Sequence, residues 1–148
     1  MRRVVVTGLG AITPLGVGIR RTWTRLIQSE CGIVSVAHHE PAQRWRELPS
    51  TVAGIVPIGT KEEGGWQPSD WLVRGDERRM AKFTQYAIAA TEMALTVAGW
   101  RPDTQDEKEM TGVCLGSGIG NLEEMYNTSL SYDKAVRLSW AGYLLRMH

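Results

Sequence analysis

One segment constrains the fold more than any other, because its apolar residues repeat at helical spacing over several turns. The repeat runs from Asp76 to Ala98 in steps of three and four residues, and Gly99 follows as a typical helix stop. Its members are Met80, Phe83, Ala87, Ala90, Ala94 and Val97. Because alanine lets a neighbouring element come close, we expect a helix over 76–98 in a central, buried position.

Short extended runs bounded by glycine or proline are predicted as strands. They are 4–6, 33–36, 50–59 and 111–120. A first helix is predicted over 17–28, with Arg20, Arg21 and Arg25 on its solvent side, and a last helix begins after Asn121, a residue suited to the N-cap. The alternation of strands and helices is typical of an α/β fold.

Charge and hydropathy exclude several classes of protein. The chain has 17 Lys plus Arg against 16 Asp plus Glu, so nothing biases it toward nucleic acid or an anionic membrane. No apolar run approaches the roughly 18 residues of a spanning helix, and the run before Thr7 is too short for a signal peptide. We expect no nucleic-acid or membrane partner and a cytoplasmic location by default, or a mitochondrial one if a leader is missing.

The cysteines do not form a recognisable site. Cys31 and Cys114 are far apart and share no metal-like spacing with His38, His39 or His148. We therefore interpret both as small buried hydrophobic residues and expect neither a metal nor a cofactor.

The glycines after the first predicted strand raise the hypothesis of a nucleotide site. Gly8 and Gly10 match the first half of G-x-G-x-x-G, but Thr13 stands at the third glycine position and Pro14 follows it. A residue before proline is biased away from helical dihedrals, so no helix N-terminus would face a phosphate. The motif therefore disfavours a Rossmann-type oxidoreductase. The second cluster, 116–120, is typical of a tight turn at a strand end.

Four blocks, taken together and in order, resemble the N-terminal part of elongating, type II β-ketoacyl-[acyl-carrier-protein] synthases. They are "RRVVVTGLGAITPLG" at 2–16, "GIRRTWTRLIQSECGI" at 18–33, "RRMAKFTQYAIAATEMAL" at 78–95 and "GVCLGSGIGNLEE" at 112–124. The longer loop before the third block is more similar to the mitochondrial branch. The resemblance implies a thiolase-like fold, a homodimer, and decarboxylative condensation of an acyl thioester with malonyl carried on acyl carrier protein.

The resemblance assigns no catalytic residue to this chain. In the family, the nucleophilic cysteine and the two histidines that stabilise the enolate lie beyond the position that matches Lys134. Neither Cys31 nor Cys114 matches the nucleophile. We expect a truncated form that is inactive alone; the alternative is a non-catalytic partner that docks acyl carrier protein or a full-length synthase.

The resemblance does assign binding residues. Ile119 matches an isoleucine that lines the acyl-chain pocket, although a buried core isoleucine is the other interpretation. Arg78 and Arg79 match basic residues that dock acyl carrier protein, and Arg74 is a weaker match, displaced by one position. The alternative for these arginines is an ordinary solvated helix face.

The resemblance divides the chain into a partial synthase domain, 1–134, and a divergent tail, 135–148. A change of reading frame or a truncated gene model explains that tail better than a new terminal helix. An α/β half without its later strands leaves a strand edge and apolar helix faces uncovered.

Overall fold

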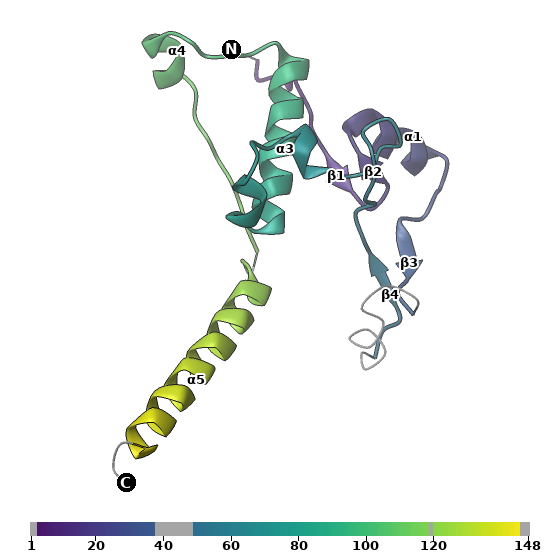
Figure 1. Ribbon diagram of the computed structural model, residues 1–148. Coiled ribbons are helices and arrows are strands. Elements are labelled where there is room, and N and C mark those ends of the chain that lie inside the picture. Colours follow the sequence, from purple (N-terminus) through teal and green to yellow (C-terminus); the bar gives the residue numbers. More distant parts are fainter. Residues whose placement is uncertain (1–2, 38–48, 119, 146–148) are drawn as a thin grey trace. The chain divides into compact units, whose positions relative to one another are not determined.

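The computed structural model describes residues 3–37, 49–118 and 120–145 (Figure 1). The chain divides into two units, Met1–Thr111 and Gly112–His148, each described by itself. The first contains β1 (Ile12–Thr13), β2 (Gly16–Val17), α1 (Ile19–Ile27), β3 (Ile33–Ser35), β4 (Val52–Gly54), α3 (Lys82–Ala98) and α4 (Gln105–Glu109), with 3₁₀ turns at Pro68–Asp70 and Asp76–Arg78. The second contains α5 (Leu122–Leu145). Among the described residues, no helix is long and apolar enough to cross a membrane.

The glycine-rich stretch near the N-terminus folds back on itself as a hairpin. Strand β1 pairs antiparallel with β2, with Thr13 opposite Gly16, so Pro14 and Leu15 form the turn. The fixed φ of proline suits such a turn, and Gly16 adopts a φ of 131° that favours glycine. The hydroxyl of Thr13 lies 3.0 Å from that of Thr22 on α1. This hairpin ends before α1 begins.

Helix α1 confirms the helix predicted over 17–28, with Arg20 and Arg21 exposed as predicted, but its other residues depart from the predicted pattern. Trp23, Leu26 and Ile27 are exposed, whereas Arg25 is half-buried. The guanidinium of Arg25 donates a hydrogen bond to the Leu15 carbonyl oxygen at 2.6 Å. The prediction that Arg25 lies on the solvent side is therefore wrong, because this arginine satisfies a carbonyl in the β1–β2 turn.

Strands β3 and β4 form a second antiparallel pair. Ile33 lies opposite Gly54 and Ser35 opposite Val52. The amide of Val36, which is buried, donates to the Thr51 carbonyl at 2.8 Å and extends the pairing. The extended runs predicted over 33–36 and within 50–59 are thus confirmed.

The core of the first unit joins the hairpin, the loop after β4, and α3. Its buried hydrophobic members are Val17, Trp66 and Ala89. The partly buried residues packed against them are Ile12, Val56, Trp71, Tyr86 and Met93. Trp66 and Tyr86 pack edge to face, with ring centroids 4.8 Å apart and an interplanar angle of 87°. Such a pair adds about 0.5–1.5 kcal/mol beyond burial alone.

Helix α3 is shorter and less buried than predicted. It begins at Lys82, after the separate turn Asp76–Arg78, and ends at Gly99 with a left-handed φ of 63°. Its buried residues are Gln85 and Ala89, while Phe83 and Val97 of the predicted apolar stripe are exposed. The helix and its glycine stop are confirmed, but the predicted face is only partly buried: Ala90 and Ala94 have the N-terminal segment packed against them, whereas its ends at Phe83 and Val97 are exposed.

Two of the predicted strands are absent from the described residues. Val4 is 99% exposed and Val113 is 92% exposed, and neither 4–6 nor 111–118 pairs with another strand. An extended segment needs a neighbour for its backbone N–H and C=O groups, and no described segment supplies one. The mixture of helices and strands fits the expected class, but the strands pair only as two antiparallel pairs in the part described.

In the second unit, α5 begins as predicted. The Asn121 side-chain oxygen accepts a hydrogen bond from the Glu124 amide at 3.2 Å, which is N-cap geometry. The helix continues without a break past Lys134 to Leu145. The domain boundary predicted at 134 lies within this helix and stays a prediction.

Candidate functional site

The predicted docking arginines lie in a tight turn before α3. We call residues 74–79 the arginine turn. Gly75 has a left-handed φ of 100°, and the 3₁₀ turn Asp76–Arg78 follows it. The Arg79 amide donates to the Asp76 carbonyl at 3.0 Å, and the Arg78 amide donates to Gly75 at 3.3 Å. The structure therefore places Arg78 and Arg79 outside the long helix, contrary to the helix predicted from Asp76.

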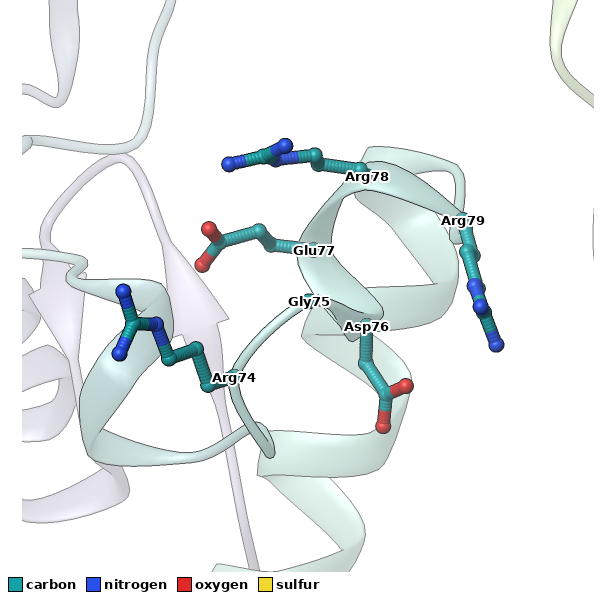
Figure 2. Close-up of a pocket in the computed structure, with 6 residues that line it drawn as sticks. All are labelled: Arg74, Gly75, Asp76, Glu77, Arg78 and Arg79. Carbon is teal, nitrogen blue, oxygen red and sulfur yellow. The ribbon is translucent and has the colours of Figure 1, made fainter.

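The three predicted arginines share the arginine turn, but their side chains do not all extend to the same side. Figure 2 shows the side chains of Arg78 and Glu77 extending to one side, where Arg74 also lies, while Arg79 and Asp76 extend away from them. All six residues of the turn line a hollow of about 530 Å³. The three arginine side chains are exposed, so a partner can reach them from solvent.

No ion pair neutralises these arginines within the part of the chain that the structure describes. The ion pairs found there join Arg25 to Glu30 at 2.5 Å and Arg101 to Glu92. Guanidinium groups stay charged at every physiological pH, and each presents several N–H donors to a carboxylate or phosphate. The arginine turn can therefore bind an acidic partner without first breaking an internal ion pair.

Sequence reasoning missed one residue that supports this turn. Gln85, on α3, is only 4% exposed. Its side-chain Nε2 donates hydrogen bonds to the Glu77 and Met80 carbonyl oxygens, both at 2.9 Å. In the sequence, Gln85 stands four residues before Ala89, so both residues lie on the same face of α3, and this face is the buried one. The predicted buried face contained other positions, so this glutamine did not stand out.

The glycine pair near the N-terminus serves close packing. A Cβ on Gly8 would lie 2.0 Å from the Ala94 carbonyl oxygen, and one on Gly10 would lie 1.9 Å from that of Ala90. The backbone at 8–10 therefore lies directly against the alanine face of α3. This packing accounts for the glycine pair without a bound nucleotide.

The other candidate residues do not form a chemical centre in the described part of the chain. Cys31 and Cys114 are free and exposed, so interpreting them as buried residues is wrong. Cys31 lies beyond the end of α1, and Cys114 lies in a segment without a strand neighbour. Among the described residues, no group of three or more His, Cys, Asp or Glu could hold a metal. Ile119 and the three histidines lie outside the described residues.

A larger hollow, of about 740 Å³, lies on the first unit. Residues of α1, α3 and the loop at 61–71 line it, with apolar side chains such as Trp71 and Met93 beside charged ones such as Arg21 and Glu92. It has no cysteine or histidine in its lining, so it offers neither a thiolate nor an imidazole for acyl transfer.

Comparison with known families identifies the chain. The family model described as "Beta-ketoacyl synthase, N-terminal domain" matches residues 1–145. The chain belongs to this family. The match covers both glycine clusters, the arginine turn and α5 of this β-ketoacyl synthase domain.

Individual relatives of this β-ketoacyl synthase domain agree. It is 44% identical over 135 residues to a protein of Schizosaccharomyces pombe, provisionally named a mitochondrial 3-oxoacyl-[acyl-carrier-protein] synthase, covering 91% of this chain and 31% of the relative. It is 39% identical to 3-oxoacyl-[acyl-carrier-protein] synthase 2 of Rhizobium meliloti, and the match covers 99% of this chain and 31% of that relative. A mitochondrial 3-oxoacyl-[acyl-carrier-protein] synthase of Arabidopsis thaliana is 40% identical, and the match covers 82% of this chain and 28% of that relative. The chain thus spans about a third of the length of these relatives.

Some relatives of this β-ketoacyl synthase domain carry a cellular location in their names. Those from Schizosaccharomyces pombe and Arabidopsis thaliana are named as mitochondrial. The cytoplasmic location expected by default for this chain stays a prediction.

Proposed function

We propose that this chain is the N-terminal part of a 3-oxoacyl-[acyl-carrier-protein] synthase of fatty acid biosynthesis, with a thiolase-like fold. The whole protein would condense an acyl thioester with malonyl on acyl carrier protein and release carbon dioxide. The family match over 1–145 and the names of the relatives support this proposal. The cysteine nucleophile and the two histidines would come from beyond the residues that match this chain.

The arginine turn carries the proposal for this chain's own role, which is to dock acyl carrier protein. Arg74, Arg78 and Arg79 are exposed, line one hollow, and form no ion pair in the described part of the chain. Acyl carrier protein presents an acidic face in the family. Complementary charges steer such partners together and fix their orientation.

Exposed apolar segments support the proposed thiolase-like assembly. Val4 and Val113 belong to segments that are apolar, extended and without strand neighbours among the described residues. Further strands of a synthase would give these backbones hydrogen-bond partners, and a second subunit would cover apolar surface. The homodimer, the acyl and malonyl thioester substrates, and the acyl-chain contact by Ile119 belong to the same proposal.

Binding of acylated carrier protein to the chain tests the docking role. We expect Arg78→Glu and Arg79→Glu each to weaken binding about tenfold or more at low salt, because each replaces attraction with repulsion. Arg20→Glu is the matched control, since Arg20 is an exposed arginine on α1 that does not line the hollow of the arginine turn. Equal losses in all three variants, or no binding by the unmodified chain, would contradict the docking role.

A further inference from the structure

One buried side chain links the arginine turn to α3. The side-chain nitrogen of Gln85 reaches the Glu77 and Met80 carbonyl oxygens, both at 2.9 Å. Only an N–H group can donate to two carbonyls, so these partners fix the orientation of the amide. Gln85 thus holds the backbone on two sides of Arg78 and Arg79.

The oxygen of the same amide has no hydrogen-bond partner in the part of the chain that the structure describes. The Gln85 Oε1 is buried and accepts no hydrogen bond from any described residue, although buried polar atoms are normally satisfied. Burying this oxygen without a partner opposes folding, so any stability that the amide adds comes from the hydrogen bonds of its nitrogen. Replacing the whole amide by an apolar group of similar size would remove this cost together with the two hydrogen bonds.

Backbone hydrogen bonds shape the arginine turn from within, but few side chains of the described residues tie it to the rest of the first unit. Its 3₁₀ segment is three residues long, and a Cβ added to Gly75, which precedes it, would have no heavy atom of a described residue within 4 Å. The arginine side chains make no ion pair in the described part of the chain. The two bonds from Gln85 are the side-chain hydrogen bonds that tie the backbone at 77–80 to the helix among the described residues.

We propose that Gln85 is a positioning residue that fixes the arginine turn on α3. The effect of this positioning on binding rests on the proposed docking function. A fixed turn presents Arg78 and Arg79 to the carrier protein in one arrangement. Preorganised charges bind more tightly than mobile ones, because less conformational freedom is lost on binding.

Hydrogen exchange on the whole chain, combined with carrier-protein binding, tests the inference. Gln85→Met keeps the approximate size and removes both donors, and Gln85→Asn keeps the amide but is one methylene short. Gln105→Met is the matched control, because the Gln105 amide on α4 is exposed and bonds Glu109 instead. The amides of Arg79 and Met80, which both donate to the Asp76 carbonyl, report on the turn, and that of Ala89 reports on the core.

We expect protection of the Arg79 and Met80 amides to fall about tenfold or more in Gln85→Met, with that of Ala89 retained, and carrier-protein affinity to fall about three- to tenfold. Gln105→Met should change neither. If Gln85→Met loses protection at Ala89 as well, the same comparison is made in Gln85→Asn. Unchanged protection at Arg79 and Met80 overturns the inference. Lost protection with unchanged affinity supports the positioning role and contradicts the docking function.

Discussion

Gly10 lies so close to α3 that an added Cβ would be 1.9 Å from the Ala90 carbonyl oxygen. Gly8 stands in the same relation to Ala94, one helical turn further along. The N-terminal segment and α3 therefore meet backbone to backbone. This contact explains why glycines in one segment occur with alanines in the other.

Gly10→Ala should destabilise the chain, because the new methyl group would meet a backbone carbonyl that cannot move aside. We expect the free energy of unfolding to fall by about 1–3 kcal/mol, as in other overpacked sites. Urea denaturation measures this change. Gly112→Ala is the control, since none of the described residues has an atom within 4 Å of its Cβ position. An equal effect at both glycines would contradict the close contact with α3.

Trp66 should contribute more to stability than any exposed tryptophan. Its side chain is 1% exposed and packs against Tyr86, so Trp66→Ala leaves a large cavity. We expect a loss of about 3–5 kcal/mol in the free energy of unfolding. Trp23→Ala, at an exposed position on α1, should change it by less than about 0.5 kcal/mol. Similar losses in the two variants would show that the core lies elsewhere.

Thr104 and Glu107 form a capping box at the start of α4, in which each side chain accepts a hydrogen bond from the other residue's amide. This capping box should be visible as a lowered pKa of Glu107. The amides of Thr104 and Asp103 donate to the Glu107 carboxylate, at 3.1 and 3.0 Å, and lower its pKa from 4.5. Because the folded pKa lies below the unfolded value, the stabilisation is complete above pH 4.5 and is lost as pH falls through the folded pKa.

Thr104→Pro tests this assignment, because proline has no amide hydrogen and its φ is close to the −76° of Thr104. Carbon-detected NMR titration of Glu107 should show its pKa moving back toward 4.5 in the variant. A pKa that does not move would assign the shift to another cause.

Glu77→Gln should strengthen carrier-protein binding. Glu77 extends to the same side of the arginine turn as Arg78 and forms no ion pair in the described part of the chain. Its carboxylate would repel an acidic partner, so its neutralisation should raise affinity about two- to fivefold at low salt. Calorimetric titration at two salt concentrations measures the effect. Weaker binding by Glu77→Gln would mean that the carboxylate itself contacts the partner.

Local capping residues in the sequence predicted the C-terminal end of α3 and the N-terminal end of α5. Gly99 ends α3 in a left-handed conformation, and Asn121 caps α5 through its side chain. These features depend on residues close in the chain, so they can be recognised without knowing the fold. The resemblance carried by the four blocks likewise leads to the family that the comparison identifies.

Features that depend on distant contacts were not predicted. The segments at Val4 and Val113 have the composition of strands, but a strand also requires a neighbour that no described segment provides. The burial of Gln85 depends on how α3 packs and on two carbonyls of the preceding turn. Asp76–Arg78 was predicted as the start of the long helix because its composition suits a helix. In the structure it forms a separate 3₁₀ turn of three residues.

The most direct test of the account is chemical-shift mapping of the labelled chain during titration with acylated carrier protein. We predict that the amides of residues 74–79 shift first and most, that the shifts weaken as salt is added, and that the amides of α1 around Arg20 stay unchanged. Shifts confined to α1, or no shift at 74–79 with a carrier protein that binds, would contradict the central claim that the arginine turn docks the carrier protein.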